Sequence, residues 1–177
     1  MAAYFFDSSA LVKRYVREAG TSFVIGLVKP SARHQLYVAR IALVEVVSAL
    51  TRRQRKGALT PDAYTKAVTR FRRVFMQQFF ALGIEAALIE QATSLAAKYA
   101  LRGYDAVQLA AVLEIQRVRA LTGVSPITLI SADKALNTAA QAEGLVVDGQ
   151  PRQPFLINSS TCDKCPAIFR ADSTRRQ

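Results

Sequence analysis

The chain has 177 residues, 51% of them hydrophobic and 21% charged, which fits a globular protein with one domain and a sizeable apolar core. Its 24 lysines and arginines outnumber its 13 aspartates and glutamates, and the net charge of +11 favours a polyanionic partner, although many basic proteins are merely soluble. No apolar run approaches the roughly 18 residues of a membrane span, and the N-terminus lacks a secretory signal pattern, so we expect a cytoplasmic protein.

The first half of the chain alternates short apolar segments with helical patterns. Residues 4–6 are predicted to form a strand that ends at Asp7, and Ser8 and Ser9 can cap the following helix, which Gly20 ends. The next patterns predict a strand at residues 35–38, a helix at 41–56 and a helix that begins at Thr60 and Pro61. The buried face of this last helix should consist of Tyr64, Ala67, Val68, Phe71, Val74 and Phe75.

The second half repeats the same alternation. The patterns predict helices at residues 86–100, 105–119 and 134–143, and strands at 127–130 and 145–147. The helix at 105–119 is apolar nearly all round and should be central. Short apolar strands alternating with helices favour the α/β class, with a parallel sheet covered by helices on both faces.

The composition changes beyond Gly149, where prolines, charged residues and hydroxyl residues dominate. We therefore expect one domain over residues 1–149 and a peripheral or mobile tail over residues 150–177. The two cysteines of the chain, Cys162 and Cys165, lie in this tail and supply only two of the four ligands of a zinc site. We interpret them as inert thiols.

Two aspartates follow predicted strands directly or closely. Asp7 follows the first strand and Asp133 follows the strand at 127–130, and the carboxyl ends of parallel strands border the ligand crevice of an open sheet. The alternative is that each aspartate only caps the next helix, because aspartate is a preferred capping residue.

Two further acids stand beside strongly apolar helical segments. Glu45 lies within the segment IALVEVVSAL, where a charge must be paired, face solvent or bind something. Asp105 precedes AVQLAA and could be a cap. A shared divalent cation explains all four acids, since clustered carboxylates repel one another unless a cation neutralises them. Hard oxygen ligands suit Mg²⁺ or Mn²⁺, which would support phosphodiester hydrolysis by an activated water.

Four motifs carry a resemblance to a known family. Asp7 opens the segment DSSALVKRY, Glu45 lies in an apolar helix, Tyr104 and Asp105 open YDAVQLAA, and Ser131 opens SADKAL. Their order and spacing resemble the PIN domain, specifically the VapC toxins of bacterial and archaeal toxin–antitoxin pairs.

The resemblance covers roughly residues 4–148 and implies a PIN-like α/β fold with a central parallel sheet flanked by helices. It further implies a homodimer and an Mg²⁺- or Mn²⁺-dependent endoribonuclease that cleaves RNA to arrest translation. The acidic positions of the family match Asp7, Glu45, Asp105 and Asp133. Ser8 and Ser131 match hydroxyl positions beside two of these acids, where they could orient a carboxylate or a water.

The resemblance also implies a small cognate antitoxin that obstructs the acidic site, often with a basic side chain. Its docking surface could include the aromatic-rich residues 71–80, unless these residues pack in the core. Positive charge for an RNA backbone could come from Arg52, Arg53, Arg55, Lys56, Lys66, Arg70, Arg72 and Arg73, or these residues could simply be a solvated surface.

Two other functions remain open at this point. The chain could be a nucleic-acid-binding protein with a degenerate PIN fold and no catalysis, although the acids at all four positions count against this. It could also be a phosphotransfer or phosphatase domain with Asp7 as nucleophile. The absence of a second acid two residues after Asp7 counts against one large class of such phosphatases.

Overall fold

The computed structural model describes residues 2–148 of the chain, so the predicted tail and its two cysteines lie outside the described residues. The elements are β1 (Ala3–Phe6), α1 (Ser8–Val12), α2 (Thr21–Leu27), η1 (Pro30–Ala32), β2 (Gln35–Ala39), α3 (Ala42–Arg55), α4 (Pro61–Gln78), β3 (Phe80–Leu82), α5 (Ala86–Tyr99), α6 (Gly103–Leu121), β4 (Ile127–Ile130), α7 (Lys134–Ala142) and β5 (Val146–Val147).

The five strands form one parallel sheet in the order β3-β2-β1-β4-β5. The chain builds outward from β1 to β3 and then returns to place β4 on the other side of β1. The strand order therefore reverses between β1 and β4, which pair along their whole length from Ala3 with Ile127 to Phe6 with Ile130. In open α/β sheets, ligands bind at such a switch point, beyond the carboxyl ends of the strands.

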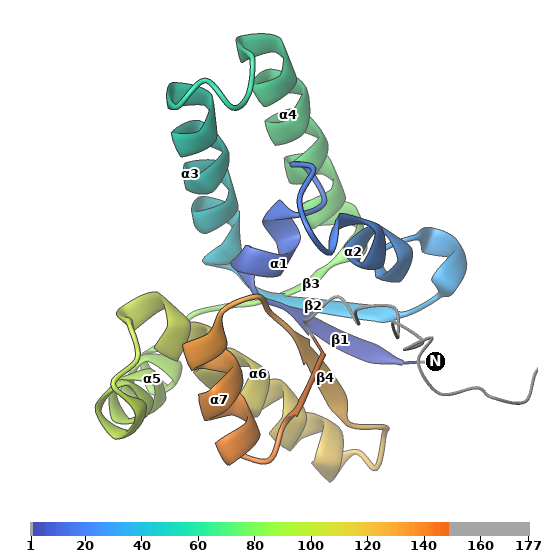
Figure 1. The fold of residues 1–177 in the computed structure, drawn as a ribbon. Helices are drawn as coiled ribbons and strands as arrows, with labels where there is room; N and C mark the ends of the chain where they lie inside the picture. Colours follow the sequence, from blue (N-terminus) through green and yellow to red (C-terminus); the bar gives the residue numbers. More distant parts are fainter. Residues whose placement is uncertain (1, 149–177) are drawn as a thin grey trace, which may run out of the picture.

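Helices cover both faces of the sheet (Figure 1), with α1 to α4 on one side and α5 to α7 on the other. Consecutive strand residues point to opposite faces, so Phe5 packs with α5, α6 and α7 while Phe6 packs with the helices of the other layer. Leu129 and Ile130 divide between the two layers in the same way. Burial on both faces explains why the strands read as unbroken apolar runs.

The predicted fold class is confirmed, because the structure is an α/β protein with a central parallel sheet flanked by helices. Helix α6 is central as expected, since it contributes eight buried residues. Thr60 caps α4 and Pro61 opens it, and Phe71, Val74 and Phe75 of its predicted apolar face are buried.

Three local predictions were incomplete or wrong. Helix α2 and strand β3 were not predicted, and α1 ends at Val12, well before Gly20. The cap of α1 is Asp7 instead of a serine, because the Asp7 side chain accepts from the backbone N–H of Ser9. Gly20 ends no helix but precedes α2, with a φ of 89° that glycine adopts without steric cost.

The helices of the described part of the chain include none that is long and apolar enough to cross a membrane.

Candidate functional site

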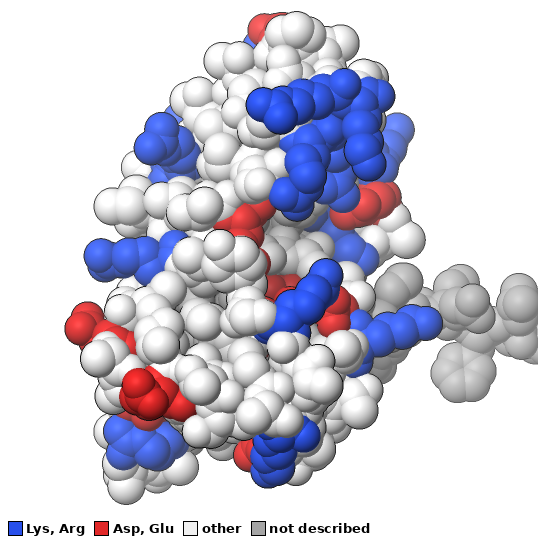
Figure 2. Space-filling model, turned by 90° about the vertical axis from the view of Figure 1, so that its left-hand side faces the viewer, with Lys and Arg blue, Asp and Glu red and all other residues white. Residues whose placement is uncertain are grey.

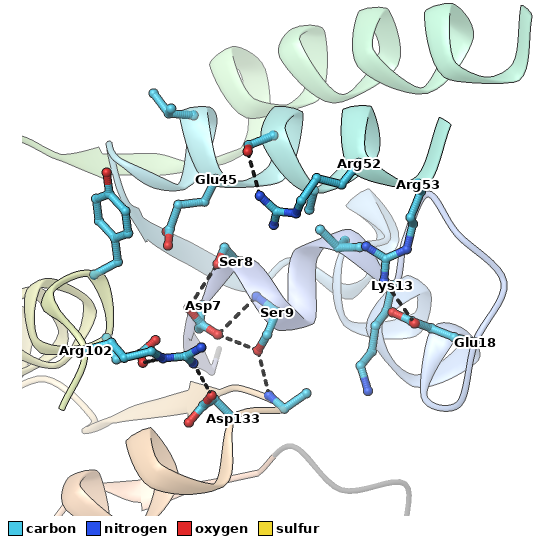
Figure 3. A pocket seen from close by; sticks show the side chains of 17 residues that line it. Asp7, Ser8, Ser9, Lys13, Glu18, Glu45, Arg52, Arg53, Arg102 and Asp133 are labelled. Carbon is cyan, nitrogen blue, oxygen red and sulfur yellow. Dashed lines mark hydrogen bonds and ion pairs between the residues drawn. The ribbon is translucent and has the colours of Figure 1, made fainter. Parts of the chain in front are cut away.

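The four predicted acids line one cavity of about 630 Å³ at the carboxyl ends of β1 and β4. They come from four separate segments, since Asp7 follows β1, Glu45 lies in α3, Asp105 lies in the first turn of α6 and Asp133 caps α7. Figure 3 shows that Asp7, Asp133 and Glu45 reach the same space from different sides. The sheet topology thus brings together carboxylates that are up to 126 residues apart in the chain.

Asp7 is the most buried of these acids, with a side chain only 2% exposed. Its Oδ2 atom accepts a hydrogen bond from the backbone N–H of Ser9 at 3.0 Å, one from the Ser9 hydroxyl, and one from the Ser131 hydroxyl at 3.3 Å. Ser8 donates to Oδ1 over a longer 3.4 Å. Burial raises the pKa of the Asp7 carboxyl above its usual value, although the bonds from Ser9 and Ser8 act in the opposite direction.

Two serine hydroxyls connect the ends of β1 and β4 through Asp7. Ser9 accepts from the backbone N–H of Ala132 at 2.9 Å, and Ser131 accepts from the backbone N–H of Asp133 at 3.0 Å. Because both hydroxyls also donate to Asp7, each one fixes the carboxylate relative to the loop that carries Asp133. Ser131 is fully buried, so water does not compete for these bonds.

Glu45 is half-buried, and its partner is an amide from the opposite layer. Gln108, which is fully buried on α6, donates from Nε2 to Oε2 of Glu45 at 2.6 Å. Burial raises the pKa of the Glu45 carboxyl, the Gln108 bond and a Ser8 bond lower it, and the charges of Asp7 and Asp105 raise it further. Within residues 2–148 no arginine pairs with Glu45, and its carboxylate faces the cavity (Figure 3).

Asp105 and Asp133 share one cationic partner, Arg102. Its Nε donates to Oδ2 of Asp105 at 2.7 Å, and its Nη2 donates to Oδ2 of Asp133 at 2.7 Å. The Arg102 side chain is 77% exposed, whereas the two carboxylates are only 13% and 22% exposed. One guanidinium therefore bridges α6 and α7 across the mouth of the cavity (Figure 3).

Positive side chains surround the acids. Lys13, Arg52 and Arg53 line the same cavity, with Arg52 bonded to Ser48 at 2.8 Å and Arg53 paired with Glu18 at 3.3 Å. Figure 2 shows Asp and Glu side chains in the hollow of this face, with Lys and Arg side chains gathered above and beside them. An anionic chain would meet cations at the rim before it reached the carboxylates.

The donor set suits a hard divalent cation, because it consists of carboxylate oxygens with hydroxyls behind them. A cation would also offset the burial that raises the pKa of Asp7 and Glu45. Among residues 2–148, no three acidic, histidine or cysteine side chains are arranged to hold an ion as they stand.

No protein-family model matches the chain, and no curated protein matches it. Solved structures do match. One is the structure of VapBC2 from Rickettsia felis bound to a DNA fragment from their promoter. Its TM-score is 0.55 at 10% sequence identity, and the match covers 83% of this chain and 98% of that one. VapC20 of Mycobacterium tuberculosis, described as a sarcin-ricin loop cleaving toxin, has a TM-score of 0.54 at 18% identity, covering 77% and 94%. A Pyrobaculum aerophilum protein has a TM-score of 0.53 at 18% identity, covering 82% and 89%.

The fold is PIN-like. At these identities the similarity concerns the fold, so the chemistry of the cavity has to be argued from the residues of this chain.

Within this PIN-like fold, the predicted site residues occupy one region. The cavity is lined by Asp7, Ser8, Glu45, Asp105 and Asp133, and Ser131 lies directly behind it as a hydrogen-bond donor to Asp7. Both aspartates that follow strands also cap helices, since Asp133 accepts from the backbone N–H of Leu136 at 3.0 Å. Capping and a place in the cavity therefore apply together and are not alternatives.

Three residues of the cavity and its support were missed in the sequence. Ser9 was interpreted only as a capping residue, and Gln108 and Arg102 were not singled out. A partial signal existed for the latter two, because each lies three residues from Asp105, Arg102 at the N-cap of α6 and Gln108 within this helix. Their bonds to Asp133 and Glu45 depend on tertiary packing and had no signal in the sequence.

Proposed function

We propose that this protein is an Mg²⁺- or Mn²⁺-dependent endoribonuclease that acts as the toxin of a toxin–antitoxin pair in the cytoplasm. The observation that carries the proposal is the meeting of Asp7, Glu45, Asp105 and Asp133 in one cavity at the switch point of a PIN-like sheet. The similarity to VapC20 and to VapBC2 supports it at the level of the fold.

The four carboxylates would hold the ion, with Asp7 as the most rigid ligand because three serines bond to it. Ser9 and Ser131 keep the Asp7 carboxylate in place, and Gln108 orients Glu45 from the other layer. When bound, the ion would supply the Lewis acidity that activates water and stabilises charge on the leaving oxygen.

The positive rim favours a nucleic-acid strand as substrate, and the family resemblance suggests that this strand is RNA. Lys13, Arg52 and Arg53 stand at the rim of the acidic cavity, where they would contact the phosphates on either side of the bond to be cut. On the neighbouring helix α4, Lys66, Arg70 and Arg73 are also exposed. Phosphate contacts of this kind add affinity but little sequence preference.

A cognate antitoxin and a second copy of the chain are the protein partners that the family resemblance suggests. The predicted docking segment at residues 71–80 is divided, because Phe71, Phe75 and Phe79 are buried in the core whereas other residues of the segment are exposed. Met76 and Phe80 of that segment are 78% and 60% exposed and remain available to a partner.

The test is cleavage of total RNA and of defined RNA oligonucleotides in Mn²⁺, in Mg²⁺ and in EDTA, beside the Asp7→Asn variant prepared identically. Cleavage that requires a metal and is lost in Asp7→Asn supports the proposal. If an authentic PIN nuclease cleaves the same RNA and this protein does not, the proposal is wrong.

A second candidate function is nucleic-acid binding without catalysis. The specific observation that favours it is Arg102, which already neutralises two of the four carboxylates. Binding of RNA that leaves the strand intact in both metals would establish this function in place of the first.

A further inference from the structure

Arg102 occupies an unusual place for an exposed residue. It lies directly before α6, at the N-cap position, and its guanidinium reaches two carboxylates that come from different helices. Both hydrogen bonds are 2.7 Å long, and the side chain that makes them is 77% exposed. The Arg102 guanidinium is therefore held by the acids of the cavity alone and can leave them without unpacking any of the core.

The two oxygens of the Asp133 carboxylate have different partners. Its Oδ1 accepts from the backbone N–H of Leu136 as the cap of α7, and its Oδ2 accepts from Arg102. Each oxygen can accept more than one partner, but a divalent cation at this carboxylate would lie beside the positive guanidinium of Arg102 and repel it. The neutral N–H of Leu136 can keep its bond as the cap of α7, whereas the exposed Arg102 side chain can rotate into solvent, so Arg102 is the group that a cation would displace.

A purely structural role is the alternative explanation, in which Arg102 fastens α6 to α7. Ion pairs with so exposed a cation contribute little to stability, because water and salt compete for the charge. The two helices also share the buried core residues Leu109, Ala110, Leu136 and Ala140. The fold does not need Arg102 to hold these elements together.

We propose that Arg102 is a positioning residue that exchanges Asp105 and Asp133 for a phosphate of the RNA when a divalent cation binds those carboxylates. In the absence of metal the guanidinium takes the place of the cation at these two acids. Once released, it stays at the cavity wall beside Asp105. This inference rests on the proposed function and names a further residue of the same site.

The chemistry of arginine favours this exchange. A guanidinium presents several N–H groups in a planar fork that fits a carboxylate or a phosphate, and it stays charged at every relevant pH. A released Arg102 would add a contact at the end of the cavity opposite Arg52 and Arg53, as their positions in Figure 3 indicate. The RNA backbone would then be held on both sides of the carboxylates.

The exchange predicts opposite changes in two measurements on the full-length Arg102→Met variant. Calorimetric titration with Mn²⁺ alone, without RNA, should show about threefold to tenfold tighter binding than in the wild type, the size expected for the loss of two exposed competing ion pairs. Cleavage of an RNA oligonucleotide at saturating Mn²⁺ should show kcat/KM reduced about tenfold or more. A merely structural role would not tighten metal binding.

Two further variants separate the specific exchange from a general effect of charge. Arg52→Met removes one positive charge from the same cavity but no contact to a carboxylate, so its Mn²⁺ affinity should change less than twofold. Arg102→Lys keeps the positive charge and loses the planar fork of N–H groups. Its Mn²⁺ affinity and its kcat/KM should therefore lie between those of the wild type and Arg102→Met. It also serves as the test variant if Arg102→Met does not fold.

Each of the other possible results contradicts one identifiable part of the proposal. Equal Mn²⁺ affinity of the wild type and Arg102→Met, or equal tightening in Arg52→Met, overturns the competition for the carboxylates. Tighter Mn²⁺ binding with unchanged kcat/KM overturns the phosphate contact. A wild type that binds no Mn²⁺ overturns both this inference and the proposed function, whereas the first two results leave the proposed function intact.

Discussion

Gln108 donates a hydrogen bond of 2.6 Å to Glu45, so a fully buried amide of α6 orients a carboxylate of α3 on the opposite layer. This bond crosses the carboxyl edge of the sheet, where the two layers of helices meet. The other polar atom of the amide, Oε1 of Gln108, is buried and has no partner among the described residues. A buried polar atom without a partner is costly, which favours a functional reason for a glutamine here.

The Gln108→Leu variant tests whether this bond matters for cleavage. Leucine removes the bond to Glu45 and also the unpartnered oxygen, so the free energy of unfolding should change by no more than about 1 kcal/mol. The cleavage rate should fall about 10- to 100-fold, as is typical when a residue that orients a metal ligand is lost. Urea unfolding and RNA cleavage in Mn²⁺ measure the two effects.

The Gln108→Glu variant is the matched control for this position. It would place a second carboxylate against Glu45 in a buried environment, and an uncompensated buried charge costs roughly 3–5 kcal/mol. We expect the strongest loss of stability in this variant. Cleavage by Gln108→Leu at the wild-type rate would show that Glu45 needs no support from α6.

Ser9 should matter more to the site than a capping residue would. Its hydroxyl donates to Asp7 and accepts from the backbone of Ala132, so Ser9→Ala frees both the carboxylate and the loop before Asp133. RNA cleavage by this variant should fall about 10- to 100-fold. Ser9→Thr retains the hydroxyl and should keep most of the activity, and equal losses in both variants would contradict the role of the hydroxyl.

The fold was largely predictable because the sequence patterns are local. Apolar runs mark strands that are buried on both faces, and Thr60 with Pro61 marks the start of a helix by rules that involve only neighbouring residues. The missed elements lack such signals. Strand β3 has only three residues and begins with Phe80, which is 60% exposed. It is a strand because it pairs with β2, and its own sequence shows no strand pattern.

The candidate site was predictable only in part, for a physical reason of the same kind. The acids stand out because a carboxylate beside a buried segment needs an explanation, and this holds for Glu45 without knowledge of the fold. An arginine or a glutamine at such a position needs no special explanation, so Arg102 and Gln108 did not stand out in the sequence. That Arg102 meets Asp133, 31 residues away, follows from the packing of α6 against α7 and β4.

The cations at the rim should determine how RNA binding depends on salt. Lys13→Gln combined with Arg52→Gln removes two positive charges from the cavity lining, and each lost phosphate contact on a single strand lowers the log–log salt slope by about 0.7. We expect weaker RNA binding and a slope reduced by about 1.4 in a titration of salt, measured in EDTA.

Arg117→Gln is the control for that experiment. It removes one charge that lies twelve residues, or about 18 Å, further along α6 from Asp105, where Arg117 pairs with Glu114. Its salt slope should equal that of the wild type. An equal loss of slope in the control would assign RNA binding to the overall charge of the protein instead of to this cavity.

Asp7→Asn should abolish cleavage and yet stabilise the metal-free protein at neutral pH. Burial raises the pKa of the Asp7 carboxyl in the folded state above its usual value of 3.8, so folding favours the protonated acid. The stabilising contribution of this group is complete below pH 3.8 and is lost as the pH rises through the raised pKa. Asparagine is neutral at every pH and also caps helices well, so it avoids this loss.

Thermal unfolding in EDTA at pH 4 to 7 measures the effect. The melting temperature of Asp7→Asn should exceed that of the wild type by at least about 2 °C at pH 7, which corresponds to roughly 1 kcal/mol for a domain of this size. The difference should shrink as the pH falls through the raised pKa of the Asp7 carboxyl. Saturating Mn²⁺ should raise the melting temperature of the wild type more than that of Asp7→Asn and reverse the order, because the variant lacks the charged Asp7 ligand. A wild type that is the more stable protein in EDTA at pH 7 would show that the serine hydrogen bonds outweigh the burial of the charge.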